Sequence, residues 1–239
     1  MRVNDPAHVA RQYATEDNLE ARRALYARVA GPDPREMVFE AVARVEPRRV
    51  LEVGGGPGEL AARIGAELKC DVVMLDLATR MVELARSRGV EAEVGDVQHL
   101  PFPDATFDCA VAAWMLYHVP DVDRGVGELA RVLRPGGRLV AATNASDHLE
   151  ELLALGGVER FELAFDAGNG EEILGRHFAL VERHDAHGTV SIDDVAALRA
   201  YFGSSERLEA GLDSVPATLD EPLVAKRHST VFVATKAER

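Results

Sequence analysis

The sequence predicts an α/β fold in which helices cover both faces of a doubly wound, mostly parallel β-sheet. From residue 48 onward, short runs rich in β-branched residues alternate with amphipathic helical segments, which is typical of such a sheet. The first of these runs leads into a glycine-rich turn and then into a helix. A chain of 239 residues with 47% hydrophobic content is also long enough to bury a full core.

The segment before residue 48 predicts three helices. Asp5-Pro6 and Asp33-Pro34 are helix-start signals, because the aspartate caps the helix and the proline fits its first turn. Between them, side chains recur at helical spacing until Gly31-Pro32 stops the helix. The residues at this spacing are Leu19, Arg22, Arg23, Tyr26 and Val29.

The alternating region predicts five strands and three helices. The strands are expected at residues 49–53, 72–75, 92–94, 108–112 and 138–142, and the helices at 59–68, 79–87 and 122–133. Gly89 and Pro135-Gly136-Gly137 act as stops. After Asn144 the alternation lapses, and strand-like runs at 179–183 and 230–235 flank a partly helical insertion at about 192–226.

The acidic balance of the chain argues against a nucleic acid partner. Forty acidic and 27 basic residues give a formal net charge of -13, whereas nucleic acid phosphates are bound mainly through Lys and Arg. The opening of the chain lacks the basic start and apolar core of a secretory signal, and the longest apolar run, residues 110–116, is too short to cross a bilayer. We therefore expect a cytoplasmic protein without a membrane segment, while the oligomeric state stays open.

Neither the cysteines nor the histidines are spaced as metal ligands. Cys70 and Cys109 are far apart, and each lies next to a strand-like run, which favours reduced, buried thiols over a disulfide. His184 and His187 lie three residues apart near the end of an expected strand, with no obvious third ligand. The sequence therefore predicts no metal site.

A glycine-rich turn at residues 54–58 is the strongest functional signal in the sequence. It follows the first expected strand and precedes the helix at Glu59, at the carboxyl edge of the sheet where doubly wound folds bind ligands. Glycines permit positive backbone angles and let a ligand approach the main chain closely. A purely structural turn is the alternative, since a glycine-rich turn alone is weak evidence.

Asp76 ends the second expected strand, where a carboxylate can accept two hydrogen bonds from a ribose diol. It can also cap the helix that begins near Thr79. Nicotinamide and flavin enzymes share these features, but a dinucleotide fingerprint that starts at Gly54 requires Gly or Ala at position 59. Glu59 stands there instead, and a carboxylate fits poorly beside a pyrophosphate at a helix N-terminus.

The order of the motifs resembles that of class I S-adenosylmethionine-dependent methyltransferases, in particular their small-molecule, type 11-like branch. Glu52-x-Gly54-x-Gly56-x-Gly58 is similar to the first motif of this superfamily, and Asp76 to its ribose-binding acid. Residues 95–102, 107–111, 116–119 and 133–137 resemble, in order, its adenine-binding segment, its fourth strand, the segment after that strand and the turn before the fifth. The resemblance is strong over residues 48–144 and implies a seven-stranded sheet whose last strand is antiparallel.

The resemblance implies S-adenosyl-L-methionine as the cofactor and S-adenosyl-L-homocysteine as the product. Asp76 would then hold the ribose hydroxyls, Asp96 would accept a hydrogen bond from the adenine amino group, and Val97 would pack on the base. The N-terminal helices and the late insertion would form a lid, although ordinary surface helices are the alternative. The implied cofactor contacts are Glu52, Gly54, Gly55, Gly56, Gly58, Asp76, Leu77, Met81, Asp96, Val97, Gln98, Ala113, Tyr13 and Tyr26.

Tyr117 and His118 follow the fourth strand, where members of the superfamily place residues that face the transferable methyl group. His118 is the leading candidate for a catalytic base, since histidine titrates near neutral pH, and packing beneath the next helix is the alternative. Asn144 ends the fifth strand and either orients the methyl acceptor through its amide or caps the next helix. Trp114 is either a wall of the acceptor pocket or a core aromatic.

We therefore expect one methyltransferase domain over residues 1–239. It would comprise an N-terminal helical lid (1–47), a cofactor-binding core (48–144) and a C-terminal half (145–239) with a lid insertion at about 191–228.

The expected reaction is in-line methyl transfer to an oxygen, nitrogen or carbon nucleophile of a small molecule, because an enclosed pocket favours such an acceptor. One alternative is a nicotinamide-dependent oxidoreductase, which Glu59 and the lack of a Tyr-x-x-x-Lys pair disfavour. The other is a non-catalytic, nucleoside-binding regulatory protein.

Overall fold

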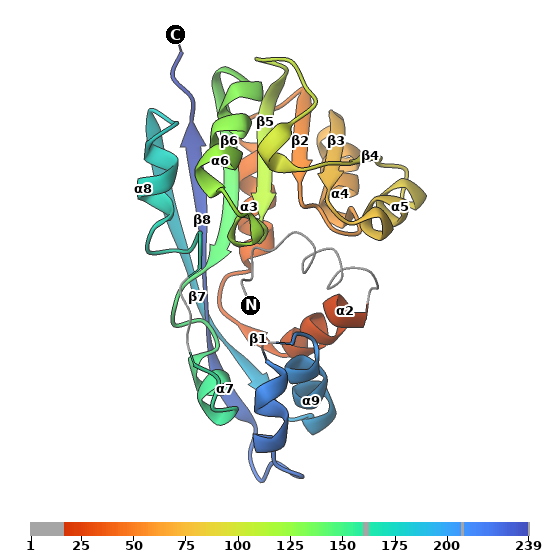
Figure 1. Cartoon of the computed structure of the whole chain (residues 1–239), viewed down its shortest axis with the longest axis vertical. Coiled ribbons are helices and arrows are strands. Elements are labelled where there is room, and N and C mark those ends of the chain that lie inside the picture. Colours follow the sequence, from red (N-terminus) through yellow and green to blue (C-terminus); the bar gives the residue numbers. More distant parts are fainter. Residues whose placement is uncertain (1–16, 160–162, 207, 239) are drawn as a thin grey trace.

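The computed structural model describes residues 17–159, 163–206 and 208–238. The helix expected at Asp5-Pro6 and the expected cofactor contact Tyr13 lie outside the described residues. Figure 1 shows an elongated molecule, with a helix-covered sheet at one end and a long hairpin that runs to the other.

Five parallel strands form the centre of the sheet and confirm the five expected strands. They are β2 (Arg49–Val53), β3 (Asp71–Asp76), β4 (Glu91–Val94), β5 (Phe107–Ala113) and β6 (Leu133–Asn144). Their order in space is β4-β3-β2-β5-β6, so the chain winds first to one side of β2 and then to the other. The carboxyl edge between β2 and β5 is therefore the switch point at which doubly wound sheets bind ligands.

The last two strands, β7 (Leu180–Ile192) and β8 (Leu223–Thr235), form a long hairpin, and β8 inserts between β6 and β7. Because β8 runs antiparallel to β6, the expected antiparallel last strand is confirmed. Each strand has 13 residues, about twice the length expected from the sequence. The sequence underestimates them because only isolated positions such as Val190 and Ile192 are apolar and buried in the far half of β7.

An eighth strand, β1 (Val29–Ala30), extends the expected seven-stranded sheet by pairing antiparallel with β7. The helix expected to include Val29 ends earlier, as α2 (Asp17–Ala24) and the 3-10 turn η1 (Leu25–Ala27). The backbones of β1 and β7 approach very closely here, since a Cβ built on Gly188 would lie 2.1 Å from the Ala30 carbonyl oxygen. Helical periodicity in the sequence carries no sign of this contact between distant segments.

Helices cover both faces of the sheet, as expected. The helices α3 (Pro34–Ala43), α4 (Glu59–Leu68) and α5 (Thr79–Ser87) pack on one face, and α6 (Val122–Val132) and α8 (Gly170–Gly175) on the other. The bounds of α4 and α5 are those expected from the sequence, and α6 ends one residue early because Leu133 begins β6. Asp33 caps α3 as expected, since its side chain accepts a hydrogen bond from the Arg35 backbone N–H at 2.9 Å.

A separate apolar cluster surrounds the far end of the hairpin. It joins η1 to α7 (Glu150–Leu155), α9 (Val195–Gly203) and the 3-10 turn η4 (Glu209–Ser214). Figure 1 shows α7 and α9 at this end of the molecule. Leu25, Leu152, Val190 and Phe202 are among its buried members. Segments from both ends of the sequence therefore share one small core outside the main sheet.

The two cysteines are free thiols, as expected. Cys109 is buried within β5, and burial raises the pKa of its thiol to about 12. Within the described ranges, no helix has the length and apolar character needed to span a lipid bilayer.

Replacement of Gly188 tests the close contact between β1 and β7. Gly188→Ala should lower the free energy of unfolding by about 1–3 kcal/mol, because the new methyl group overlaps the Ala30 carbonyl and the strands must separate. Urea denaturation measures this change. Gly203→Ala, at an open position in α9, is the matched control and should be neutral or stabilising by up to about 1 kcal/mol. Equal stability of the two variants would contradict the contact.

Candidate functional site

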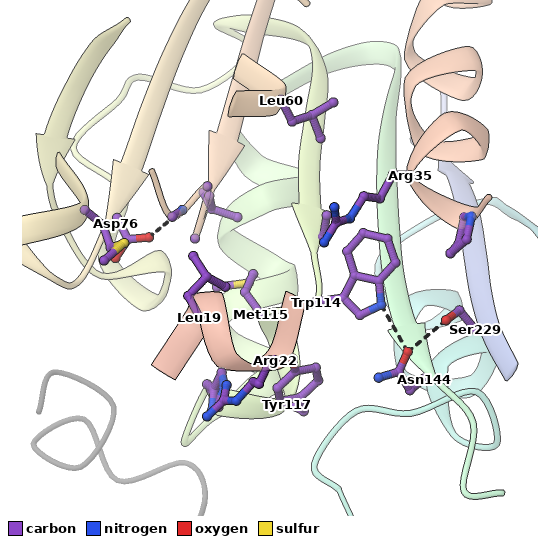
Figure 2. A pocket seen from close by; sticks show the side chains of 18 of the residues that line it. Leu19, Arg22, Arg35, Leu60, Asp76, Trp114, Met115, Tyr117, Asn144 and Ser229 are labelled. Carbon is purple, nitrogen blue, oxygen red and sulfur yellow. Dashed lines mark hydrogen bonds between the residues drawn. The ribbon is translucent and has the colours of Figure 1, made fainter. Parts of the chain in front are cut away.

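A cavity of about 1120 Å³ lies at the carboxyl edge of β2, β3, β5 and β6. The turns after these strands form one side of it, and α2, η1 and α9 face them from the other side, as Figure 2 shows for Leu19 and Arg22 of α2. The expected site residues that line the cavity are Glu52, Gly54, Gly55, Gly56, Asp76, Leu77, Met81, Asp96, Val97, Gln98, Ala113, Tyr117, His118, Asn144 and Tyr26. The sequence therefore identified most of the sheet side of this cavity.

The turn after β2 needs glycine at the positions that face the cavity. Gly54 and Gly56 have φ angles of 62° and 56°, in the left-handed region that side chains disfavour. Apart from Gly56 and its two chain neighbours, no atom of the described residues lies within 4 Å of a Cβ built on Gly56, so a ligand can approach the main chain there. Gly58 instead faces α5, where a Cβ would lie 2.6 Å from the Ala85 Cβ. Gly58 thus lets α4 and α5 pack closely and does not line the cavity.

The Asp76 carboxylate joins the turn after β2 to the start of α5. It accepts hydrogen bonds from the backbone N–H groups of Gly56 and Ala78, each at 2.9 Å. Burial raises the pKa of Asp76, while these two N–H groups act in the opposite direction. The Asp76 side chain thus binds the N–H of Ala78, the residue before α5, but α5 has no side-chain hydrogen bond at its N-cap, so the expected capping role is wrong. The carboxylate also lines the cavity.

Glu52 is a buried acid at the end of β2, with 2% of its surface exposed. Its Oε2 atom has no hydrogen-bond partner within the described part of the chain. Burial, with a smaller contribution from the nearby Asp76, raises its pKa to about 8, although a hydrogen bond from the Ala61 backbone acts in the opposite direction. Because an unpaired buried carboxylate is costly, a ligand that brings an N–H donor or a positive charge would stabilise its ionised form.

The turn η2 (Val97–His99) after β4 holds a second acid at the cavity. Asp96 accepts hydrogen bonds from the backbone N–H of Gln98 at 2.9 Å and from its side-chain Nε2 at 2.9 and 3.1 Å. The Oε1 atom of Gln98 accepts a hydrogen bond from the backbone N–H of Asp121 at 3.1 Å. Gln98 thus positions Asp96, a role that its place in the motif did not reveal.

Trp114 and Asn144 form a polar and aromatic wall on the other half of the cavity (Figure 2). The Nε1 atom of Trp114 and the Oγ atom of Ser229 both donate to Asn144 Oδ1, at 3.1 and 2.9 Å. These bonds orient the Asn144 amide, and no capping bond from its side chain is among the helix caps described. Trp114 has a positive φ of 54°, a strained conformation that for a bulky residue points to a functional constraint.

Tyr117 and His118 lie on the 3-10 turn η3 (Leu116–His118) and line the same half of the cavity. Their ring centroids are 4.5 Å apart, with a tilt of 60°. The loop after β5 thus places one phenol and one imidazole beside Trp114. The structure places both side chains at the cavity, and their catalytic role stays a prediction.

A hydrogen-bonded Tyr–His pair faces the cavity from the side of η1, and no sequence pattern indicated it. The hydroxyl of Tyr26 lies 2.9 Å from His148 Nε2, and the His228 backbone N–H lies 3.1 Å from His148 Nδ1. Burial lowers the pKa of His148 to about 4 and raises that of Tyr26 above its usual range. Both side chains are therefore neutral near pH 7. His148 lies in no motif, and its partners come from distant elements.

Comparison with known proteins agrees with this geometry. Residues 51–141 match the family model described as a methyltransferase domain. The chain is 40% identical over 103 residues to the ubiquinone/menaquinone biosynthesis C-methyltransferase UbiE of Teredinibacter turnerae, which covers 38% of this chain and 41% of that protein. It is 33% identical over 162 residues to methyltransferase GfsG of Streptomyces halstedii, which covers 64% of this chain and 58% of that protein.

Among solved structures, the YcgJ protein of Bacillus subtilis has the same fold, with a TM-score of 0.63 and 19% identity over 85% of this chain and 100% of that chain. The chain spans about half the length of the curated relatives it matches. The fold and the cavity define a doubly wound α/β protein with a cavity at its switch point. The matched segment is more specific, because residues 51–141 match a methyltransferase domain and the aligned curated relatives are methyltransferases.

The buried carboxyl of Glu52 should make the ligand-free protein less stable as the pH rises. The folded protein keeps a proton on Glu52 up to about pH 8, whereas the unfolded chain releases it above pH 4.5. The stability that comes from the protonated Glu52 carboxyl is therefore fully present below the unfolded-state pKa. It is lost as the pH rises through the folded-state pKa. The loss should be on the order of 3–5 kcal/mol.

Urea denaturation at several pH values between these limits measures the effect. Glu52→Gln should remove this part of the decline, and Glu93→Gln, at an exposed position on β4, is the control that should keep it. The same pH dependence in Glu52→Gln and in the unmodified chain would show that Glu52 is not the group responsible.

Proposed function

We propose that this chain transfers the methyl group of S-adenosylmethionine to a small-molecule acceptor. The observation that carries the proposal is the joint lining of one cavity. Asp76 and Asp96 lie in its sheet side, and Trp114, His118 and Asn144 lie next to them along the same edge. A donor and an acceptor held in one enclosed site can react without diffusing apart.

The residues along β2 to β4 fit the chemical groups of the cofactor. Asp76 offers carboxylate oxygens to ribose hydroxyls, and Asp96 offers them to an exocyclic amino group. Glu52 has a buried oxygen that no described residue hydrogen-bonds, which suits the ammonium group of the amino-acid part. Met81 and Val97 are buried apolar side chains at the same end of the cavity and suit the faces of the base.

The cofactor supplies a methyl group on a positively charged sulfur, which is already a strong electrophile. The protein then has to align the acceptor atom and keep water out. Asn144 can orient a polar acceptor, because Trp114 and Ser229 fix its amide oxygen and leave the amide nitrogen as the donor. The indole of Trp114 provides an apolar surface for the body of the acceptor.

His118 is the residue that we assign as proton acceptor for a hydroxyl or ammonium nucleophile. His148 also lines the cavity, but burial lowers its pKa to about 4, so it is a weak base. Its hydrogen bond with Tyr26 suits both side chains for binding the acceptor rather than for removing its proton. Tyr117, next to His118, is placed to contact the acceptor.

The N-terminal segment and the insertion after β7 act as a lid in this proposal, within one methyltransferase domain. Arg22 of α2 donates from Nη2 to the Ser204 carbonyl at the end of α9 at 3.0 Å, so the two lid segments are linked. Tyr26 and Tyr201 line the cavity from this side. Small molecules are the acceptors that fit a covered site, and quinone-type or natural-product acceptors accord with the names of the relatives.

A dinucleotide cofactor fits this site less well. Glu59 lies in the first turn of α4 and lines the cavity, where a pyrophosphate would need positive charge or free N–H groups. Arg23 forms an ion pair with Glu59 at 2.8 Å, so the positive charge of Arg23 is already partly neutralised. The oxidoreductase alternative thus has no observation in its favour.

Ligand binding gives the first test. S-adenosylhomocysteine at about 100 times its Kd should stabilise the folded chain by about 2.7 kcal/mol and raise Tm by roughly 5–10 °C, whereas NAD should not. Asp76→Asn should remove most of the shift. Asp71→Asn, at the exposed amino end of the same strand, is the matched control and should keep it. A shift with NAD alone would support the oxidoreductase, and a shift with neither ligand would contradict cofactor binding.

The assignment of His118 requires an acceptor, which a screen of metabolites with isotopically labelled S-adenosylmethionine can identify. With an acceptor that must lose a proton, His118→Ala should lower turnover by about 10²–10⁴-fold and leave the S-adenosylhomocysteine shift in Tm unchanged. His177→Ala, which removes a histidine beside Asp123 away from the cavity, is the control and should leave both properties unchanged. Full turnover in His118→Ala would exclude this residue as the base.

A further inference from the structure

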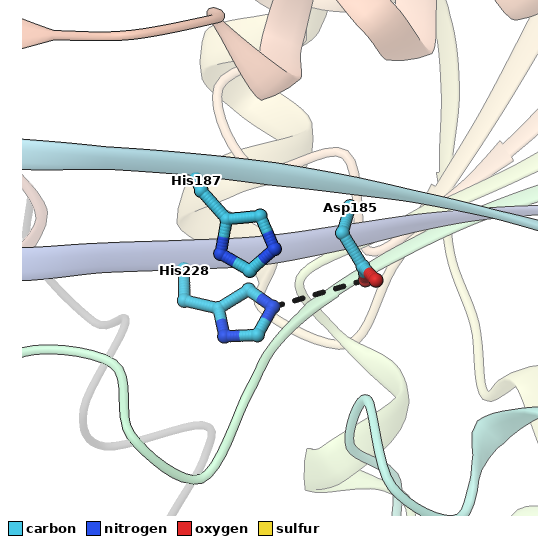
Figure 3. A group of neighbouring side chains, drawn as sticks. All are labelled: Asp185, His187 and His228. Carbon is cyan, nitrogen blue, oxygen red and sulfur yellow. Dashed lines mark ion pairs between the residues drawn. The ribbon is translucent and has the colours of Figure 1, made fainter.

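Three potential metal ligands meet on the far part of the β7–β8 hairpin, apart from the residues that line the cavity. Asp185 and His187 are two residues apart on β7, so they share one face, and His228 of β8 lies opposite His187 in the strand register. One ligand atom of each of these side chains lies within 4.8 Å of the others (Figure 3). The hairpin thus assembles one carboxylate and two imidazoles.

This cluster differs from the His184 and His187 pair, which the sequence pattern disfavoured as a metal site. These two histidines are three residues apart on a strand and therefore point to opposite faces. His184 lies 4.0 Å from Glu182, away from the cluster. The ligand missing from the sequence pattern is His228, which only the pairing of β7 with β8 brings close.

A carboxylate behind His228 fixes the protonation of its ring. Asp147 Oδ1 lies 2.7 Å from His228 Nδ1, so Nδ1 is the nitrogen that carries the proton and donates. The lone pair is then on Nε2, which is shielded from solvent and has no hydrogen-bond partner in the described ranges. Nε2 faces Asp185, with an oxygen at 3.8 Å. A buried acceptor without a donor favours binding of a positive ligand.

We propose that Asp185, His187 and His228 bind a divalent transition metal ion, with zinc as the best match to this donor set. Imidazole and carboxylate are common zinc ligands, and a carboxylate behind a ligating histidine is a frequent feature of such sites. Two ligand atoms at about 2.0–2.1 Å from a tetrahedral zinc ion lie roughly 3.3–3.4 Å apart. The 3.8 Å between His228 and Asp185 therefore closes with a small side-chain rotation.

The surrounding charges permit this ligation. Asp185 accepts hydrogen bonds from Arg183 Nε at 3.0 and 3.1 Å and from Thr230 Oγ1 at 2.7 Å. A carboxylate has about four lone-pair positions, so these bonds hold the group in place and leave it able to bind an ion. Lys226 contacts Asp147 at 3.1 Å on its other oxygen, which leaves the bond to His228 intact. Three protein ligands leave one position for water, so the ion should exchange readily.

Direct metal binding tests the proposal without any methyl-transfer assay. The untagged full chain, at about pH 7.5 where free histidine is mostly neutral, is titrated with ZnCl2 by calorimetry and with CoCl2 by absorption spectroscopy. We expect one ion per chain and the visible absorption bands of cobalt in a low-symmetry site. His187→Ala, at an exposed position, should abolish both signals. Asp147→Asn should weaken zinc binding by about 10–100-fold through loss of the orienting carboxylate.

His184→Ala is the matched control, because it removes a histidine from the same strand but from the opposite face, and it should bind zinc as the unmodified chain does. His228→Ala serves as a second ligand variant once circular dichroism shows that it is folded. Absence of zinc binding would overturn the proposal and leave His228 as a proton-mediated bridge between Asp147 and Asp185. Equal losses in His184→Ala and His187→Ala would also overturn it.

Discussion

The site depends on the hydrogen bonds between the Asp76 carboxylate and two backbone N–H groups. Gly56 belongs to the turn after β2 and Ala78 to the start of α5, and Asp76 binds both at 2.9 Å. The two turns beside the switch point of the sheet therefore keep a fixed spacing before any ligand arrives. This preorganisation explains why an acid at the end of β3 lines the cavity and holds both turns at once, since one carboxylate has enough oxygen lone pairs for these bonds and for a ligand.

The other side of the cavity has a different origin. It does not belong to the sheet core but to the apolar cluster around the far end of the hairpin, which includes Leu25, Val190 and Phe202. β1 joins the N-terminal segment to β7, and Arg227 of β8 donates to the Pro32 carbonyl just after β1. The parts of β7 and β8 that extend beyond the central parallel strands provide the surface on which these segments pack. Because the two sides of the cavity belong to separate cores, substitutions on the side of η1 and α9 can alter its shape without disturbing the glycine-rich turn after β2.

The sequence predicted the parts whose signals are local and missed those that depend on distant contacts. The bounds of α4 and α5 followed from caps, stops and helical periodicity within the segments themselves. β1 depends on the contact of Ala30 with Gly188, and no pattern around residue 29 reveals it. Within the site, Asp76 lies at the end of a strand whose position the apolar pattern of the sequence predicts. His148 is positioned instead by Tyr26 and by the His228 backbone, which lie in other elements.

Strand β8 connects the cavity with the histidine cluster on the hairpin. Because side chains alternate along a strand, Arg227 and Ser229 line the cavity while His228 points to the opposite side. The loop before α7 repeats this division, since Asp147 binds the His228 ring and the next residue, His148, receives the His228 backbone N–H and faces the cavity. A rotation of the His228 ring that broke its bond to Asp147 would therefore act on the loop that carries His148. His228 therefore contacts both regions, because its backbone binds His148 at the cavity and its ring belongs to the histidine cluster on the hairpin.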